Sequence, residues 1–235
     1  MTQDIDHWTR KASDWIAWAR APGHDAFWAY RDAFVALVGD GSGKALDIGC
    51  GEGRVSRLLG ALGYDVTACD PVPEMVAAAR GAGSAQAYHV ASATDLPYPD
   101  GAFALTLLYN CLMDIKDAEA AMAEARRVTA PGGRVLVSIV HPIADLMTTW
   151  QDPGQSDSDY FRSQVFDVVD EDAGLRMHFY GWARPLSFYT EGLRSARMTI
   201  NRIVEPRPST HPAFSKQARW HRVPLFLWID ARPSR

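Results

Sequence analysis

The residues best suited to chemistry gather in one short stretch, 45–54. An apolar run carries Asp47 and is followed by three glycines at alternate positions, Gly49, Gly51 and Gly53. Glycine adopts positive φ and lets a ligand approach the backbone closely, because no Cβ intervenes. An amphipathic run follows directly, so the stretch predicts a buried strand, a tight turn and a helix whose first N–H groups can bind a polar ligand. Asp47 would repel a pyrophosphate and attract an ammonium or another cationic group.

A second carboxylate follows the next apolar run. Asp70 ends a predicted strand at 65–70 and lies 19 residues after Gly51. A carboxylate in that place can accept hydrogen bonds from both hydroxyls of an adenosine ribose. Every adenosine cofactor makes this demand, so Asp70 alone does not separate one class of adenosine-cofactor enzyme from another.

The acid and the G-x-G-x-G turn together resemble the first motif of the class I S-adenosylmethionine-dependent methyltransferases of the small-molecule type. Residues 93–103 resemble a second stretch of that family, and residues 124–137 resemble its E-x-x-R-V-x-x-P-G-G-R-V-L-V stretch. The resemblance covers residues 40–140 well and the remainder in outline. A dinucleotide fingerprint would instead need a glycine where Arg54 stands.

The resemblance implies the cofactor S-adenosylmethionine, with S-adenosylhomocysteine as its product. In the family, an acid at the place of Asp95 lies beside the adenine amino group. The residues just after the fourth strand lie where the methyl donor meets its acceptor. The implied cofactor-binding residues are Asp47, Gly49, Cys50, Gly51, Arg54, Asp70, Pro71, Met75, Thr94, Asp95, Leu96, Tyr109 and Asn110. For Asp95 a turn acid that binds its own backbone is the simpler alternative, and for Met75 ordinary packing is.

Strands and helices alternate along the chain, which predicts an α/β fold with a doubly wound parallel sheet. The resemblance adds seven strands, a Rossmann-like methyltransferase order and an antiparallel last strand. We expect one domain over residues 1–235. Its parts are a helical cover (1–44), a cofactor-binding core (45–142), an inserted substrate cap (143–185) and a helix with strands that complete the sheet (186–235). Alternating residues at 165–169 and 175–180 predict a β-hairpin within the cap.

Candidates for binding the acceptor come from the cover and the cap. The aromatic-rich amino terminus supplies Trp18, and Arg20 and His24 flank the break between its two predicted helices. The hairpin supplies His178 and Tyr180. Core packing is the alternative for tryptophan at this density, and surface capping is the alternative for Arg20 and His24.

Two residues are candidates for catalysis. His141 follows the predicted fifth strand, where its imidazole could take a proton from a hydroxyl or amine acceptor. Tyr109 ends the fourth strand, next to the expected methyl group. His178 is a second candidate base. The alternative is that His141-Pro142 only shapes the turn into the cap, and a neutral amine acceptor needs no base.

Composition limits the function further. The chain has 235 residues, 47% of them hydrophobic, and a net charge of −4, which indicates a globular protein without a general affinity for nucleic acid or anionic membranes. Residues 1–183 carry 14 Lys and Arg against 25 Asp and Glu, whereas residues 184–235 carry 10 against 3. Internal pairing of the two parts explains this asymmetry, with a basic lip that faces an anionic substrate as the alternative. We therefore expect the protein to act on a small-molecule acceptor, as a monomer or a homodimer.

Three cysteines, Cys50, Cys69 and Cys111, show no metal-binding spacing and fit a reducing cytoplasm. We expect no metal site, no signal segment and no membrane span. The predicted function is methyl transfer to an oxygen or nitrogen of a small metabolite, and the sequence does not identify the acceptor. A nicotinamide-dependent oxidoreductase and a catalytically silent cofactor-binding module are the alternatives.

Overall fold

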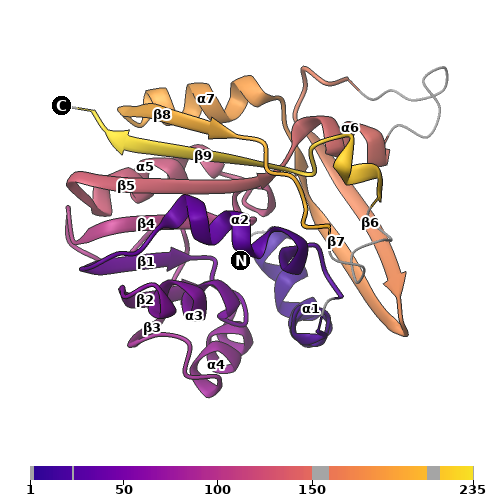
Figure 1. The fold of residues 1–235 in the computed structure, drawn as a ribbon, viewed down its shortest axis with the longest axis horizontal. Helices are drawn as coiled ribbons and strands as arrows, with labels where there is room; N and C mark the ends of the chain where they lie inside the picture. The colour runs from indigo at the N-terminus through magenta and orange to yellow at the C-terminus, as the bar shows by residue number, and fades with distance from the viewer. Residues whose placement is uncertain (1–2, 23, 150–158, 211–217, 235) are drawn as a thin grey trace.

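Figure 1 shows the computed structural model as a central sheet with helices on both faces and a separate β-hairpin at one side. The structure describes residues 3–22, 24–149, 159–210 and 218–234. Parts of the predicted cap, and residues 211–213 of a loop expected at 205–213, lie outside these ranges.

The central sheet has seven strands in the order β3-β2-β1-β4-β5-β9-β8. Neighbours among the first five run parallel, and β9 runs antiparallel to both β5 and β8. The predicted fold class, including the antiparallel last strand, is therefore confirmed. The strands are β1 (Lys44–Ile48), β2 (Asp65–Asp70), β3 (Ala87–Val90), β4 (Phe103–Tyr109), β5 (Thr129–Val140), β8 (Met198–Val204) and β9 (Phe226–Pro233).

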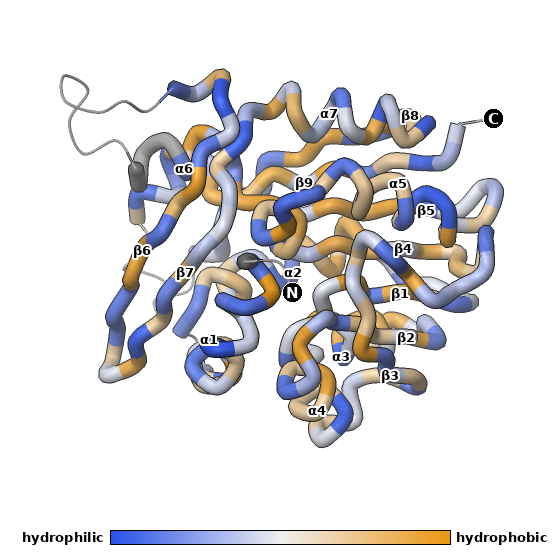
Figure 2. Tube along the Cα trace, turned by 180° about the vertical axis from the view of Figure 1, so that it is seen from behind, coloured by the Kyte–Doolittle hydropathy of each residue, from blue (hydrophilic) through white to orange (hydrophobic). Residues whose placement is uncertain are grey.

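Helices bury both faces of this sheet. One core lies between the sheet and α5 and α7, and a second lies between the sheet and α2 and α3. Figure 2 shows hydrophobic residues along β4, β5 and β9, as burial on both faces requires. The helices are α1 (Gln3–Arg20), α2 (Phe27–Val38), α3 (Arg54–Ala61), α4 (Pro73–Gly81), α5 (Ala118–Val128), α6 (Pro142–Thr149) and α7 (Leu186–Ser195), with the short 3₁₀ turn η1 (Leu112–Asp114). Within the described ranges no helix has both the length and the apolar character that a membrane span needs.

Some boundaries differ from the sequence-based expectation. The strand expected at 134–140 begins at Thr129 and runs through the Pro131-Gly132-Gly133 breaker. Phe103 pairs with Thr129 and Leu105 pairs with Arg134, so the residues between form a bulge that tolerates proline and glycine. Helix α6 inside the predicted cap was not expected at all.

The predicted hairpin is present and longer than expected. Its strands are β6 (Gln164–Asp172) and β7 (Leu175–Ala183), joined at Ala173 and Gly174 with φ of 50° and 79°. Positive φ at both central residues is the geometry of a tight two-residue hairpin turn. Both views place α1 between this hairpin and the central sheet (Figures 1 and 2), so cover and cap meet above the strand ends.

Candidate functional site

The glycine turn joins the end of β1 to the start of α3. Gly49 and Gly51 have φ of 69° and 54°, a region that side chains rarely adopt. A Cβ on Gly49 would lie 2.7 Å from the Cβ of Cys111, and one on Gly51 would lie 3.1 Å from Nε1 of Trp15. The turn therefore depends on glycine both for its backbone conformation and for the close approach of neighbouring side chains.

Two buried carboxylates flank this turn. Asp47 accepts a hydrogen bond from the Ser56 hydroxyl at 2.5 Å, and burial raises its pKa to about 7. Asp70 accepts hydrogen bonds from the backbone N–H groups of Gly51 (3.0 Å) and Val72 (2.9 Å). Burial raises the pKa of Asp70 to about 6, and those hydrogen bonds oppose the rise. Carboxylates in such a position favour a ligand that brings an ammonium or hydroxyl groups.

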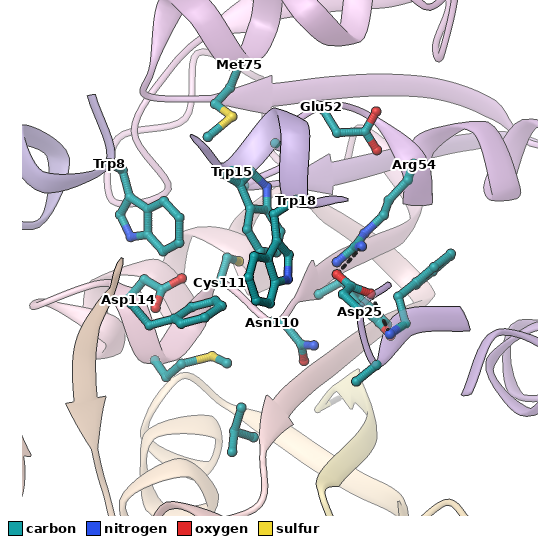
Figure 3. A pocket seen from close by; sticks show the side chains of 18 of the residues that line it. Trp8, Trp15, Trp18, Asp25, Glu52, Arg54, Met75, Asn110, Cys111 and Asp114 are labelled. Atoms are coloured by element: carbon teal, nitrogen blue, oxygen red, sulfur yellow. Dashed lines mark hydrogen bonds and ion pairs between the residues drawn. The ribbon is translucent and has the colours of Figure 1, made fainter. Parts of the chain in front are cut away.

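The cover is clamped onto the glycine turn by ionic and aromatic contacts. Arg54 forms an ion pair with Asp25, and its guanidinium lies 5.2 Å from the Trp15 ring and 4.7 Å from the Phe27 ring (Figure 3). Arg20 at the end of α1 pairs with Glu52 at 3.2 Å. These contacts hold α1 over the turn, where it can exclude water.

A cavity of about 1850 Å³ opens at the carboxyl ends of the parallel strands, beneath α1 and the hairpin. Most small-molecule sites measure roughly 300–1,000 Å³, so there is room for a cofactor and a second molecule together. The strand ends contribute the glycine turn, Asp70, Tyr109 and Asn110, while the cover contributes Trp8, Trp15 and Trp18.

Eleven of the thirteen predicted cofactor residues border this cavity. They are Asp47, Gly49, Cys50, Gly51, Arg54, Asp70, Pro71, Met75, Thr94, Tyr109 and Asn110. Asp95 and Leu96 follow directly on Thr94 but are not part of the described lining. Leu96 is buried in the core, and its N–H donates to Glu124 at 2.8 Å. Arg127 donates to the carbonyls of Leu96 and Tyr98, so α5 holds this loop against the cavity.

The predicted acceptor-binding residues divide between the cavity and its surroundings. Trp18 and His24 border the cavity, and His24 also pairs with Asp172 near the hairpin turn at 3.7 Å. Arg20 is outside the described lining, where it ties α1 to Glu52.

His178 and Tyr180 are also outside the described lining, because the register of the hairpin places them on its other face. Val168 pairs with Phe179 across the hairpin, and both border the cavity. Side chains alternate along a strand, so His178 and Tyr180 project from the opposite face. They contact His7 of α1 instead, which stacks on Tyr180 with ring centres 5.2 Å apart.

Tyr109 and Asn110 lie where the fourth strand meets the cavity. The Tyr109 hydroxyl is buried and has no hydrogen-bond partner among the described residues, and burial raises its pKa. Asn110 has φ of 49°, and its side-chain oxygen accepts a hydrogen bond from the Ser138 hydroxyl at 2.6 Å. A strained, anchored residue at this place is typical of a binding site.

His141 is placed differently from the expectation. It is buried and is not part of the described cavity lining. Its Nδ1 accepts a hydrogen bond from the N–H of Ile143 at 3.0 Å, which leaves the hydrogen on Nε2, 3.0 Å from the Glu205 carboxylate. With both ring nitrogens engaged, no lone pair faces an acceptor, and this geometry is unfavourable to the predicted base role.

Several lining residues were not singled out from the sequence. Trp8 and Trp15 are two helical turns apart on α1, so their spacing was a usable signal. Asp4, Asp114 and Asp145 come from α1, η1 and α6, and no local pattern links them. Four buried polar atoms around the cavity have no hydrogen-bond partner among the described residues: Asp4 Oδ1, Trp8 Nε1, His24 Nε2 and the Tyr109 hydroxyl. Such atoms fit a cavity that holds polar ligands.

No group of three or more His, Cys, Asp or Glu side chains in the described part of the chain is arranged to hold a metal ion.

Comparison with known proteins agrees with this geometry. Residues 46–137 match a family model described as a methyltransferase domain. The chain is 36% identical over 143 residues to malonyl-[acyl-carrier protein] O-methyltransferase of Serratia marcescens, covering 57% of this chain and 56% of that protein. It is 36% identical over 118 residues to demethylmenaquinone methyltransferase of Beutenbergia cavernae, covering 49% and 48%.

The chain thus spans about half the length of the curated relatives that it matches. Among solved structures, an S-adenosylmethionine-dependent methyltransferase from Mesorhizobium loti superposes with a TM-score of 0.66 at 22% identity, covering 87% of this chain and 97% of that one. At this identity the likeness shows a shared fold.

Proposed function

This chain belongs to the class I S-adenosylmethionine-dependent methyltransferase family, and from that premise we propose that it transfers the methyl group of S-adenosylmethionine to an oxygen or nitrogen of a small metabolite. The observation that carries the proposal is the pair of buried carboxylates, Asp47 and Asp70, on either side of a glycine turn that borders a cavity with room for two ligands.

The residues present fit this cofactor. Asp70 can accept from ribose hydroxyls with its remaining lone pairs, and Asp47 offers a carboxyl group beside the turn. Met75 and Thr94 border the same cavity as Asp70 and would contact the adenine. When bound, S-adenosylmethionine supplies a sulfonium methyl group that a nucleophile displaces in line. The chain's own part is to align the two molecules and to exclude water, for which Trp15 and the Arg54–Asp25 pair cover the turn.

Titration calorimetry tests the proposal directly. S-adenosylhomocysteine should bind the wild-type protein, and Asp70→Ala should weaken its affinity by roughly tenfold to a hundredfold, because charge-assisted hydrogen bonds are lost. Asp65→Ala, at the exposed start of the same strand, is the matched control and should bind as the wild type does. Binding of NADH with no binding of S-adenosylhomocysteine would overturn the proposal in favour of an oxidoreductase.

Binding alone does not distinguish an enzyme from a silent cofactor-binding module. Transfer of a labelled methyl group to any small molecule of a metabolite extract separates the two, because a silent module binds the cofactor and transfers nothing. We propose a small-molecule acceptor, no nucleic-acid or membrane partner, and a monomer or homodimer. Cys50, Cys69 and Cys111 are buried free thiols, which supports the proposal of a cytoplasmic, reducing location.

A further inference from the structure

Three carboxylates border the cavity near the ends of the fourth and fifth strands. Asp114 lies in η1 just after β4, Asp145 lies in the first turn of α6 just after β5, and Asp4 begins α1. The N–H of Lys116 donates to Asp4 Oδ2 at 3.1 Å, which draws α1 against the segment after η1. We call Asp4, Asp114 and Asp145 the acidic corner.

Acidic side chains outnumber basic ones around the cavity. The described lining holds eleven Asp and Glu against three Lys and Arg. Of those three, Arg54 is paired with Asp25, while Lys116 and Arg219 are exposed. Arg184 is the cation that lowers the pKa of Asp114, but its guanidinium donates to the carbonyls of Leu112, Ile115 and Lys116. Arg20 and Arg57, which lie outside the described lining, pair with Glu52, but acidic residues still outnumber basic ones among the residues that border the cavity.

An independent observation indicates a ligand at this corner. Asp4 is 7% exposed, it borders the cavity, and its Oδ1 has no hydrogen-bond partner among the described residues. Burial raises the pKa of Asp114 well above its usual value, and the nearby Asp145 and Asp4 raise it further. Asp114 and Trp8 both border this cavity, and both are labelled in Figure 3. Carboxylates and an indole ring that line the same cavity are a combination that binds ammonium groups.

We propose that the methyl acceptor is an amine, bound as a cation by the acidic corner and the ring of Trp8. This inference rests on the proposed function and selects one of its two acceptor classes. A carboxylate acceptor would instead enter among three carboxylates, with no unpaired buried cation in the described lining to receive it.

The corner also provides for the proton that an ammonium must lose before it reacts. The ammonium passes one proton to the Asp114 carboxylate, which leaves a lone pair on nitrogen. That lone pair forms the new N–C bond to the methyl group, while the C–S bond breaks and its electron pair stays on sulfur. The products are a methylated ammonium and a neutral sulfide, and Asp114 later releases its proton to water. Because burial raises its pKa, Asp114 is suited to hold that proton.

A matched probe series tests the inference on intact protein saturated with S-adenosylhomocysteine. The probes are 2-phenylethylamine, 2-phenylethanol and phenylacetate, which have similar size and differ in charge. Calorimetry should show the amine binding at least about tenfold more tightly than the other two. Asp114→Asn and Asp4→Asn should each reduce that preference by roughly tenfold, with affinity for S-adenosylhomocysteine unchanged. Asp6→Asn removes a charge from the same helix outside the described lining and should keep the full preference.

Each result decides the matter. Equal or tighter binding of the alcohol or the carboxylate, absence of amine binding, or a preference that survives both substitutions overturns the inference while the proposed function stands. Absence of S-adenosylhomocysteine binding overturns the proposed function and this inference with it. If circular dichroism shows that Asp114→Asn is unfolded, Asp4→Asn provides the same test.

Discussion

At the scale of single residues, burial of the Asp47 carboxyl raises its pKa, and this leads to a prediction about stability and pH. Its pKa rises from 3.8 to about 7, so the folded state binds this proton more tightly than the unfolded state does. This tighter proton binding stabilises the folded state relative to the unfolded state. The stabilisation is fully present below pH ~4 and is lost as the pH rises to ~7. Asp47→Asn cannot ionise, so relative to wild type it should gain stability over that interval, on the order of a few kcal/mol. Thermal melts of the cofactor-free protein from pH 4 to 7.5 measure the difference.

Asp65→Asn is the control for that experiment, because Asp65 is exposed at the start of β2. Its melting temperature should differ from wild type by the same amount at every pH. A difference for Asp47→Asn that is likewise independent of pH would show that Asp47 is ionised in the folded protein over the whole range.

His141 gives a second prediction at this scale. A general base should cost roughly a hundredfold or more in turnover when it is removed. Since both ring nitrogens already have partners, we expect His141→Gln to lower single-turnover methyl transfer no more than it lowers stability. Glu205→Gln disturbs the same hydrogen bond and should act alike. A large loss of turnover in His141→Gln alone, with normal melting and cofactor affinity, would restore the base role.

At the scale of elements, α1 closes the site without building the sheet. Neither of the two large cores contains a residue of α1, whereas Trp15 lies over Gly51 and Arg20 reaches Glu52. Deleting residues 1–20 should therefore leave a folded sheet by circular dichroism and weaken S-adenosylhomocysteine binding by roughly tenfold or more. Lys11→Ala, on the same helix, should have no effect on binding. Unchanged affinity after the deletion would mean that α1 does not cover the cofactor.

The hairpin gives a further prediction, on the acceptor side. Phe179 borders the cavity and packs edge-on against Trp18, whereas Val165 is exposed on the other face. Phe179→Ala should raise the acceptor KM by roughly tenfold with little change in cofactor affinity, because an aromatic wall of the acceptor site is lost. Val165→Ala should leave KM unchanged. A larger effect of His178→Ala on KM, at equal stability, would contradict this arrangement.

On the scale of the whole molecule, cover, core and cap contact one another around one cavity. Helix α1 packs on both α4 and β7, so we expect a single unfolding transition in calorimetry. A ligand at about 100 times its Kd adds roughly 2.7 kcal/mol of stability. At roughly 2–4 °C per kcal/mol for a chain of this size, S-adenosylhomocysteine should raise the melting temperature by about 5–11 °C. Two transitions, only one of which shifts, would show that cover and core unfold separately.

Local patterns explain why much of the fold could be predicted from the sequence. The run from Lys44 to Ala61 forms its strand, turn and helix from neighbouring residues alone, and glycine spacing specifies the turn. The hairpin was predictable for the same reason, since alternation and a two-residue turn are both local. The bulge at Thr129 was not, because it depends on how β5 pairs with β4.

The sequence by itself determined which segments form strands and helices, the glycine turn and the acids beside it, because each depends on residues close together in the chain. Only the tertiary structure decided which side chains share the cavity. Lys116 and Asp4 are 112 residues apart, and His141 and Glu205 are 64 apart, yet each pair is hydrogen-bonded. The register of the hairpin likewise places Phe179, and not His178, on the cavity side, since a shift of one residue exchanges the two faces of a strand. Such contacts join residues that are far apart in the sequence, so no local sequence pattern predicts them.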